Sequence, residues 1–492
     1  MGLLTNLLHY LECSAERFPD KTAFSDEKES VTFSRLLELG RRIGSSIAGH
    51  VRDTHRPIAV LTSHSACDIA AFIGVLYAGC FYIPLDAAAP DVYTTNRLRT
   101  IAPAMTIEAR TLDDLPQETP DLERLETIRR HVLPTDPAYA IFTSGSTGAP
   151  KAALISHGSV VNLAEWFFET FGFSERTIFA AQAPLFFDAS VKEIYSTLRN
   201  GCTTYFLPKK LFFSPLKVIS RVREVGATVL PWAAAAMKMI ANSGVFEQSI
   251  PESVEDVIFG GENMPSKTLN IWKRALPRVR FTNVYGPSET TVDCAYYTAY
   301  RELSDSVSVP IGYPTRAMEL LLLDEYGKPV PDGDPGEIYV RGAGVGLGYY
   351  GDPVQTAQSF VQNPLNPKYR DIVYRTGDIA KRNEYGELVF LARADDQVKH
   401  MGSRIELGEV ESVAAGIDGV RLVCCAYDKQ RSKLIMFYEG SLSEQDLSIC
   451  LNAGLPRYMC PNVVIKVDEM PVTPNGKVDR IRVRDVYYEH KQ

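Results

Sequence analysis

A loop rich in small, hydroxyl-bearing residues is the first part of this sequence that could do chemistry. It runs from Thr143 to Lys151 (TSGSTGAPK) and follows the apolar run 139–142, so we expect a loop that leaves a β-strand. Its hydroxyls, its glycines, whose backbone N–H groups can turn toward an anion, and its lysine suit a polyphosphate. The spacing is not GxxxxGK[ST], because Pro150 stands five residues after Gly145. Composition alone fits an ordinary surface turn equally well.

Three charged residues in other turn-like sequences could act on such a ligand. Glu289 ends YGPSE, and a carboxylate near phosphate oxygens can hold Mg²⁺, which keeps several waters and needs few protein ligands. Asp378 follows Gly377 in what we expect to be a tight turn, where an exposed carboxylate can accept hydrogen bonds from two ribose hydroxyls. Lys477 lies in the turn sequence PNGK, and its ammonium could stabilise charge that builds up on a phosphoryl group. Without further context, Glu289 and Lys477 are more typical of solvated turn residues, and Asp378 could be an ordinary turn cap.

The elements that must position these residues follow two patterns. From about Phe24 to Ala235, apolar runs such as PIAVLTS and TIFAAQA alternate with stretches of helical periodicity, which favours parallel sheets covered by helices. Between about 306 and 391, short β runs are broken by turn signals at 326–327, 332–333 and 385–386, which predict hairpins and a small antiparallel barrel. After Arg393, a polar segment precedes a helix-like stretch and alternating strands. We therefore predict an α/β fold with a core domain at 1–395, including the β-barrel subdomain, and a small mobile α+β domain at 396–492.

Composition narrows the class of protein. The chain has 492 residues, 45% hydrophobic and 23% charged, which is typical of a packed globular protein. Its net charge of −8 and the lack of a basic run argue against a nucleic-acid partner. No signal peptide or long apolar run is visible, so we expect no membrane insertion and a cytoplasmic location. The nine cysteines contain no CxxC pair and fit buried thiols in a reducing compartment. The glycines at 336–351 lack the GxGxxG spacing and favour close packing instead.

Several stretches together carry a resemblance to a known family. The phosphate-type loop at 143–151 resembles the signature loop of the adenylate-forming superfamily, which includes acyl-CoA synthetases, luciferases and the adenylation domains of nonribosomal peptide synthesis. Further stretches occur in that family's order and cover nearly the whole chain. These are LYAGCFYIPLD (76–86), FFDAS (186–190), NVYGPSE (283–289), GEIYVRGAGVGLGYY (336–350), YRTGD (374–378), ARADDQVKHMGSRIELGEVE (392–411), LPRYMCP (455–461) and NGKVDR (475–480). Within the family, the order of these motifs and the residues in them look like those of amino-acid-activating enzymes, especially free-standing D-alanine–carrier protein ligases.

The resemblance implies ATP and Mg²⁺ as cofactors and assigns roles to individual residues. Glu289 would hold Mg²⁺, Tyr285 would stack on adenine and Asp378 would bind ribose. Lys477 would be the catalytic lysine that bridges the substrate carboxylate and the α-phosphate, and Asp395 the hinge about which the small domain rotates between half-reactions. The implied nucleotide-binding residues are Thr143, Ser144, Gly145, Ser146, Thr147, Gly148, Lys151, Gly261, Glu262, Asn283, Tyr285, Gly286, Ser288, Asp378, Phe390, Arg393 and Lys399.

The same resemblance outlines a substrate pocket. A carboxylate in a substrate cleft needs a partner, and in amino-acid-activating relatives the counterpart of Asp188 pairs with the α-ammonium of the substrate. Lys192 is unusual in such a lining and could pair with a side-chain carboxylate, as in glutamate- or glutamine-activating domains. Alternatively, Lys192 and Asp293 neutralise each other, or Lys192 points away from the pocket. The implied lining is Asp188, Ala189, Lys192, Pro231 (or its neighbour Trp232), Ile258, Gly260, Val284, Val292 and Asp293.

These features imply an enzyme that forms aminoacyl-AMP from an acidic or amide amino acid and passes the acyl group to the phosphopantetheine thiol of a carrier protein. The sequence ends soon after NGKVDR, so we expect the carrier to act in trans. A D-alanine ligase is the main alternative, although Gly260 should leave more room than the bulkier residue of those enzymes. An acyl- or aryl-CoA ligase and a nucleotide-binding pseudoenzyme are weaker alternatives. Asp188 argues against the former, and retention of Glu289, Asp378 and Lys477 argues against the latter.

Overall fold

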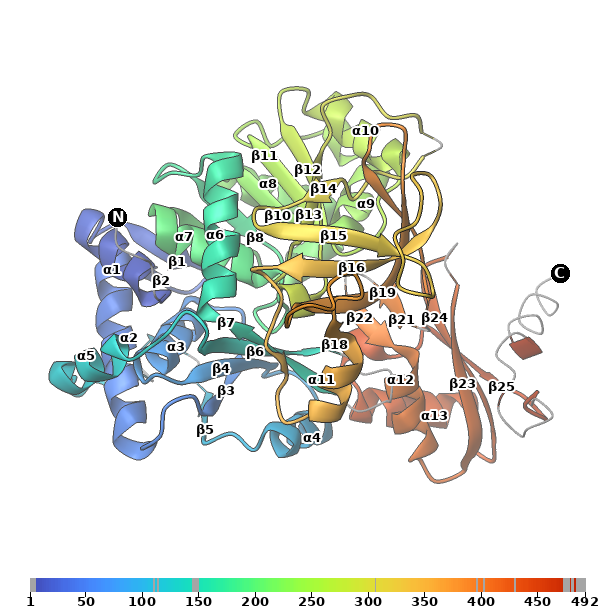
Figure 1. Ribbon diagram of the computed structural model, residues 1–492, viewed down its shortest axis with the longest axis horizontal. Helices are drawn as coiled ribbons and strands as arrows, with labels where there is room; N and C mark the ends of the chain where they lie inside the picture. The colour runs from blue at the N-terminus through green and yellow to red at the C-terminus, as the bar shows by residue number, and fades with distance from the viewer. Residues whose placement is uncertain are drawn as a thin grey trace. The chain divides into compact units, whose positions relative to one another are not determined.

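Two compact units make up the chain in the computed structural model (Figure 1). The structure describes residues 6–108, 111–112, 115–143, 150–305, 307–394, 397–400, 403–428, 431–471, 478 and 482–483. The first unit comprises Met1–Ala87, Ile101–Phe142 and Ala152–Ala394. The second comprises Ala88–Thr100, Thr143–Lys151 and Asp395–Gln492. The mixed α/β fold class expected from the sequence is confirmed.

The first sheet has six strands, most of them parallel, as the alternating sequence pattern predicts. Its order is β17 (Gly348–Tyr349), β7 (Lys151–Ser156), β6 (Pro137–Thr143), β4 (Phe81–Asp86), β3 (Pro57–Thr62) and β5 (Met105–Glu108). The short β17 is antiparallel to β7, so the glycine-rich segment ends as an edge strand of this sheet.

The second sheet has nine strands and carries the pocket side of the candidate site. Strands β8 to β12 run parallel to one another, whereas β13 is antiparallel to β12 and β14 is antiparallel to β13. Its order is β14 (Tyr313–Pro314), β13 (Ala295–Thr298), β12 (Arg280–Tyr285), β11 (Asp256–Gly260), β10 (Val229–Ala233), β8 (Ile178–Ala181), β9 (Thr203–Phe206), β1 (Thr22–Ser25) and β2 (Ser30–Thr32).

The third sheet is antiparallel and corresponds to the predicted β subdomain. Its path is β15 (Met318–Leu323), β16 (Gly336–Gly342), β19 (Ile372–Arg382) and β18 (Phe360–Gln362), with β20 (Leu388–Arg393) beside β19. The predicted turns are present, because Gly327, Gly333 and Gly386 adopt the positive φ that such turns require. One local expectation was wrong: Asp378 lies inside strand β19, where a bulge with Gly377 at φ +73° replaces the expected tight turn.

Helices cover these sheets, and their ends follow the sequence. Ser65 and Asp68 form a reciprocal capping box at the start of α3, and Gly172 and Gly201 end α6 and α7 in the left-handed conformation. The helices of the first unit are α1 (Leu8–Arg17), α2 (Phe33–His50), α3 (Ala66–Tyr77), α5 (Leu122–Arg130), α6 (His157–Phe171), α7 (Ser190–Asn200), α8 (Pro215–Glu224), α9 (Ala234–Asn242), α10 (Ser266–Ala275) and α11 (Pro353–Ser359). In the described part of the chain, no helix is long and apolar enough to cross a membrane.

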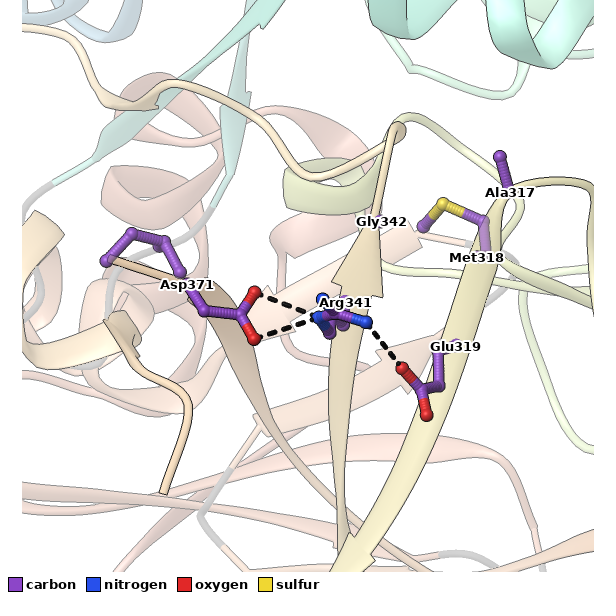
Figure 2. Close-up of a pocket in the computed structure, with 7 residues that line it drawn as sticks. Ala317, Met318, Glu319, Arg341, Gly342 and Asp371 are labelled. Atoms are coloured by element: carbon purple, nitrogen blue, oxygen red, sulfur yellow. Dashed lines mark hydrogen bonds and ion pairs between the residues drawn. The ribbon is translucent and has the colours of Figure 1, made fainter. Parts of the chain in front are cut away.

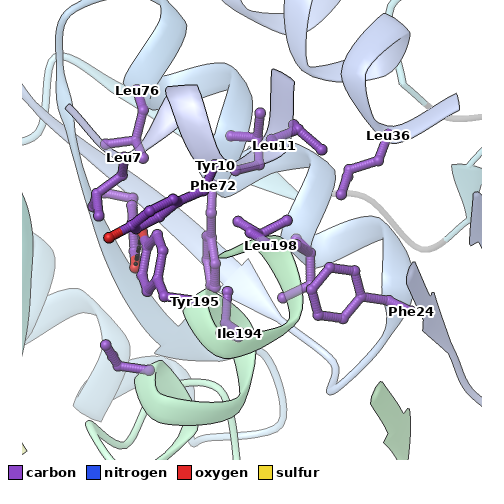
Figure 3. Packing of buried hydrophobic residues seen from close by; sticks show 14 of the residues in the cluster. Leu7, Tyr10, Leu11, Phe24, Leu36, Phe72, Leu76, Ile194, Tyr195 and Leu198 are labelled. Atoms are coloured by element: carbon purple, nitrogen blue, oxygen red, sulfur yellow. Dashed lines mark hydrogen bonds between the residues drawn. The ribbon is translucent and has the colours of Figure 1, made fainter. Parts of the chain in front are cut away.

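A large apolar cluster fixes α7, the helix that begins beside Asp188. Side chains from α1, α2, α3 and α7 converge there, among them Leu11, Leu36, Leu76 and Leu198 (Figure 3). Tyr195 on α7 lies at hydrogen-bond distance, 3.1 Å, from the hydroxyl of Tyr82 on β4. Because every turn of α7 is packed, its first turn has little freedom to move, and the side chains that it carries hold defined positions.

The second unit combines the C-terminal elements with an earlier helix. They are β21 (Gln397–His400), β22 (Ser403–Glu406), α12 (Leu407–Ala415), β23 (Val420–Asp428), β24 (Lys433–Gly440), α13 (Glu444–Gly454) and β25 (Val463–Lys466). Most of α4 (Asp91–Ile101), which the sequence analysis placed in the first domain, belongs to this unit. Arg97 of α4 forms a buried ion pair of 2.9 Å with Glu409, and Tyr93 lies 3.1 Å from the hydroxyl of Tyr458. The division at residue 395 stays a prediction.

Candidate functional site

The carboxyl ends of three neighbouring strands bring most of the apolar pocket residues together. In register, Pro231 on β10 lies beside Ile258 on β11, and Gly260 on β11 lies beside Val284 on β12. All four are buried. Since parallel strands end at the same edge of a sheet, this edge is where an α/β fold binds ligands.

Gly260 does not leave the open room that the sequence analysis expected. A Cβ atom at this position would lie 2.4 Å from the backbone oxygen of Val284 and 3.0 Å from its Cγ2. The glycine therefore serves the close approach of β11 to β12 rather than adding space to the pocket. A larger residue here would require a shift of β12, so size alone does not exclude D-alanine as a substrate.

The start of α7 contributes the charged wall of the site. Asp188 and Ala189 precede the helix and Lys192 lies in its first turn, close enough for its charge to act on the Asp188 carboxylate. Asp188 is half-buried, and desolvation of its carboxylate raises its pKa above the ordinary range. The Ser288 hydroxyl and the Lys192 ammonium oppose that rise, while Glu289 adds to it. The pocket therefore holds an acid whose ionised form gains from a cationic ligand.

Lys192 pairs with Asp293, one of the alternatives left open by the sequence. The Lys192 Nζ atom lies 3.4 Å from Asp293 Oδ2, and both side chains are buried. Burial raises the pKa of Asp293, Lys192 lowers it, and the nearby charge of Asp188 raises it further. At 3.4 Å the contact is longer than a typical charge-assisted hydrogen bond of 2.7–2.9 Å. The ammonium of Lys192 therefore points toward Asp293 and not away from the pocket residues.

A strained turn carries three more of the predicted residues, Ser288, Glu289 and Val292. Glu289 sits in the 3-10 helix η4 (Ser288–Thr290), and Thr291 and Val292 follow with φ of 60° and 69°. A β-branched residue in this left-handed region is unfavourable and persists only where its surroundings hold it. Glu289 is fully buried, at 0% exposure, so the interpretation of this carboxylate as a solvated turn residue is wrong.

Gly286 is needed where this turn folds back on itself. A Cβ atom there would lie 2.2 Å from the backbone oxygen of Val292 and 2.9 Å from Asp293 Cα. We therefore expect Gly286→Ala to lower the free energy of unfolding by about 1–3 kcal/mol through steric overlap. Urea unfolding measures the loss. Gly49→Ala is the matched control, because nothing lies within 4 Å of a Cβ atom at that helical position. If Gly286→Ala unfolds at the same urea concentration as the wild type, the close packing at Gly286 is refuted.

A second group of predicted residues meets around Asp378. Its Oδ2 accepts a hydrogen bond of 2.5 Å from the Tyr285 hydroxyl, and its Oδ1 accepts one of 2.6 Å from Arg393. The bulge at 376–378 fixes the position of Asp378, because the Asp378 N–H donates a hydrogen bond of 3.0 Å to the Thr376 hydroxyl. Asp378 is only 2% exposed, so the expectation of an exposed carboxylate is wrong. Burial raises the pKa of Tyr285 well above its usual value, and the Asp378 charge adds to this, so the tyrosine stays a donor.

The remaining described nucleotide candidates each have contacts of their own. Asn283 is buried and donates to the Pro310 carbonyl at 2.8 Å. Glu262 pairs with Lys238 at 3.0 Å, directly after Gly261 at the end of β11. Phe390 packs against the apolar cluster of the antiparallel sheet. Thr143 ends β6 and Lys151 begins β7, at the two ends of the predicted phosphate loop.

Several predicted residues cannot be placed. Lys399 lies in β21, but its side chain is outside the described part of the structure. Seven others lie outside the described residues altogether, so their proposed roles stay predictions. These are Ser144, Gly145, Ser146, Thr147, Gly148, Asp395 and Lys477.

A separate cavity of about 440 Å³ lies in the antiparallel sheet and contains none of the predicted residues. Figure 2 shows Arg341 between two carboxylates there, at 2.9 Å from Asp371 and 3.0 Å from Glu319. Asp371 also accepts hydrogen bonds from Asn363 and Asn366. Since these charges are paired with each other, the cavity is well explained as a structural network of the sheet.

The parallel sheets and the pocket at their strand ends have the arrangement in which α/β enzymes bind ligands, and the Tyr285–Asp378–Arg393 group lies in the same unit. The family model described as AMP-binding enzyme matches residues 11–350, and the chain belongs to this family. By family the chain is an AMP-binding enzyme, and its fold is similar to that of a nonribosomal peptide synthetase protein with an adenylation domain.

Individual relatives support this assignment. The chain is 34% identical to surfactin synthase subunit 1 of Bacillus subtilis (strain 168) over 95% of its own length and spans 14% of that protein. It is 31% identical to zwittermicin A synthase ZmaJ of Bacillus cereus, covering 94% of this chain and 92% of that one. Among solved structures, IdnL1 is 26% identical with a TM-score of 0.80, covering 96% and 100% of the two chains. A protein with adenylation and PCP domains, holo-PA1221, is 24% identical with a TM-score of 0.81, covering 98% and 84%, and supports the fold.

Proposed function

We propose that this enzyme activates an amino acid with ATP as its aminoacyl-AMP and then transfers the acyl group to the phosphopantetheine thiol of a carrier protein. The observation that carries the proposal is the charged wall of Asp188, Lys192 and Asp293 beside the carboxyl ends of β10, β11 and β12. A desolvated carboxylate of raised pKa is stabilised by a cationic partner, and an α-ammonium group is such a partner. Fatty and simple aryl acids lack this group.

In the first half-reaction, the substrate carboxylate attacks the α-phosphorus of ATP and pyrophosphate leaves. Asp378, held by Tyr285 and Arg393, would accept bonds from the ribose by exchanging or sharing its present donors. Lys477 would stabilise the charge on the phosphoryl oxygens in the transition state. The second half-reaction forms a thioester and releases AMP, so no cysteine of this chain is needed as a nucleophile.

Mg²⁺ fits the donor set of this site as a companion of ATP. No group of three or more His, Cys, Asp or Glu side chains in the described residues is arranged to hold a metal ion. Mg²⁺ needs only one or two protein carboxylates when phosphates and waters supply the other oxygens, and Glu289 offers one. When bound, the ion would neutralise charge on the phosphate oxygens.

The substrate side chain should be acidic or an amide, of the glutamate or glutamine kind. Lys192 can donate to a carboxylate or carbonyl oxygen, and its long contact with Asp293 leaves that interaction open to exchange. Asp293 can accept from an amide N–H₂ group, or it can share a proton with a substrate carboxylate, since its pKa is raised by burial. A methyl side chain would use neither residue, which ranks D-alanine second.

A carrier protein is the proposed acceptor because of what the relatives contain. Holo-PA1221 combines adenylation and PCP domains, and NpsA–ThdA from Klebsiella oxytoca is an artificially fused adenylation–PCP protein. We propose that the carrier is a separate protein. Transfer of labelled substrate to a pantetheinylated carrier, compared with transfer to coenzyme A, distinguishes the two acceptors.

Amino-acid-dependent ATP–pyrophosphate exchange tests the first half-reaction. The assay covers the twenty amino acids, D-alanine, β-amino acids, aryl acids and short fatty acids. We expect exchange with glutamate or glutamine and none with the simple carboxylates. Exchange with carboxylates alone would overturn the proposal, and absence of exchange with every acid would support a nucleotide-binding pseudoenzyme.

Lys192 should determine the preference for a polar side chain. We expect the double change Lys192→Met and Asp293→Asn to raise the KM for the preferred amino acid about 10- to 100-fold, the loss of one charge-assisted hydrogen bond. Changing both residues avoids leaving Asp293 buried without its partner. Lys210→Met, at an exposed lysine paired with Glu27, is the control. An unchanged ranking of substrates in the double variant would remove the argument for an acidic or amide side chain.

A further inference from the structure

The glycine-rich segment 344–349 holds the turn that carries Glu289. The Gly346 N–H donates to the Glu289 carbonyl at 2.8 Å, and the Gly344 carbonyl accepts from the Thr291 hydroxyl at 2.6 Å. A Cβ atom at Gly346 would lie 3.0 Å from the same Glu289 oxygen and 2.9 Å from the Leu154 oxygen. The segment therefore approaches the turn at backbone distance, which only glycine allows without a shift.

Tyr349, at the end of this segment, reaches the Glu289 side chain. Its hydroxyl donates to Glu289 Oε1 at 2.8 Å, and the two residues are 6% and 0% exposed. Strand β17 pairs Tyr349 with Ala153, and its ring packs edge-on against Phe360 at a centroid distance of 5.6 Å. The Tyr349 N–H also donates to the Thr356 hydroxyl at 2.9 Å. Backbone and ring are thus both fixed, with the hydroxyl aimed at one carboxylate oxygen.

We propose that Tyr349 is a positioning residue for Glu289, which orients this carboxylate for the Mg²⁺ of MgATP. The proposal rests on the proposed function, in which Glu289 is the metal-holding carboxylate. A ligating carboxylate is itself normally hydrogen-bonded, and loss of such an outer partner typically weakens metal affinity 10- to 100-fold. Both residues are buried, so the loss of this hydrogen bond should cost more than the loss of an exposed one.

Tyr349→Phe tests this role while keeping the ring that packs on Phe360. We expect the Mg²⁺ concentration for half-maximal ATP–pyrophosphate exchange to rise about 10- to 100-fold, with little change in the KM for the amino acid. A second readout needs no turnover: the rise in melting temperature with ATP and Mg²⁺ over that with ATP and EDTA. We expect this increment to shrink in the variant, while the melting temperature without ligand changes little.

Two control variants separate positioning from general loosening. Thr291→Val removes the tie between the same turn and Gly344 but leaves the Tyr349–Glu289 bond, so the Mg²⁺ requirement should stay near that of the wild type. Tyr350→Phe removes a hydroxyl from the neighbouring residue, whose ring packs on Phe81 instead. An equal rise in Mg²⁺ requirement in Thr291→Val and Tyr349→Phe would overturn the proposal, and so would an unchanged requirement in Tyr349→Phe.

A double-mutant cycle completes the test. If Tyr349 acts through Glu289, adding Tyr349→Phe to Glu289→Gln should have little further effect on the Mg²⁺ dependence of the melting temperature. Additive effects would assign Tyr349 a separate structural role. Failure of the proposed function is distinguishable, because it would appear as a wild-type enzyme with no amino-acid-dependent exchange, whereas the melting-temperature increment still reports on MgATP.

Discussion

Asp188→Asn is expected to lower amino-acid-dependent ATP–pyrophosphate exchange about 100- to 4,000-fold at pH 7, mainly through the KM for the amino acid. Removing one partner of a desolvated charge pair costs about 3–5 kcal/mol, because the other charge is left uncompensated. At about 1.4 kcal/mol for each tenfold change, this predicts the stated range. Asparagine keeps the shape of the side chain, so its effect reports on charge and not on packing.

A des-amino substrate provides the control for Asp188. If glutamate supports exchange, glutarate has the same carbon chain without the α-ammonium, and the wild type should discriminate strongly between the two. Asp188→Asn should remove most of this discrimination, because it acts only where the ammonium binds. A variant that keeps the wild-type KM for the amino acid, or keeps the discrimination, would show that Asp188 does not hold the amino group.

The raised pKa of Asp188 also predicts a pH dependence. The ammonium needs the ionised carboxylate, so kcat/KM for the amino acid should fall as pH drops through the raised pKa of Asp188, above the usual range of an aspartate. Groups that face this carboxylate are Lys192, Ser288, Glu289 and Asp293, and Asp293 has a raised pKa of its own. If Asp188 causes the fall of kcat/KM at low pH, this fall should be absent in the Asp188→Asn variant and still present in the Asp293→Asn variant.

The sequence predicted the parts of the fold that local patterns encode. Alternating apolar runs and helical stretches identify the parallel sheets, and Gly327, Gly333 and Gly386 mark real turns because only glycine readily adopts their positive φ. The bulge at Asp378 could not be predicted, since Thr-Gly-Asp is also a common turn sequence and only the pairing of β19 with β16 selects the bulge. Likewise, the role of Gly260 could not be predicted, because it depends on the distance between β11 and β12, which no single stretch of sequence specifies.

Candidate site residues were found where a motif marks them and missed where only tertiary packing does. Glu289 and Asp378 were assigned through family resemblance, but their burial was not, because local sequence cannot show that Tyr349 and Arg393 cover them. Tyr349 itself gave no signal beyond its place after a glycine run. Glu193 gave none either, since a glutamate next to a lysine in a helix is normally solvated.

The second prediction with a large expected effect concerns Glu193 and the stability of the folded protein. It lies on α7 at 1% exposure, and neither carboxylate oxygen has a hydrogen-bond partner on another residue in the described part of the chain. Burial raises its pKa to about 8, with Lys192 opposing the rise and Asp293 adding to it. The folded protein therefore keeps a proton that the unfolded chain releases near pH 4.5, the ordinary value for this residue. Between these two pH values, each rise in pH favours the unfolded state.

Glu193→Gln should remove this penalty, because an amide cannot ionise. Since one pKa unit corresponds to about 1.4 kcal/mol, we expect the variant to gain several kcal/mol over the wild type above pH 8 and little near pH 4.5. The difference should grow as pH rises through this window and level off beyond the folded-state pKa. Melting temperatures and urea midpoints at pH 5, 7 and 9 measure it, with Glu252→Gln at an exposed position as control. An equal difference at all three pH values would show that Glu193 does not titrate between the folded and unfolded states, and that the buried face of α7 tolerates its charge.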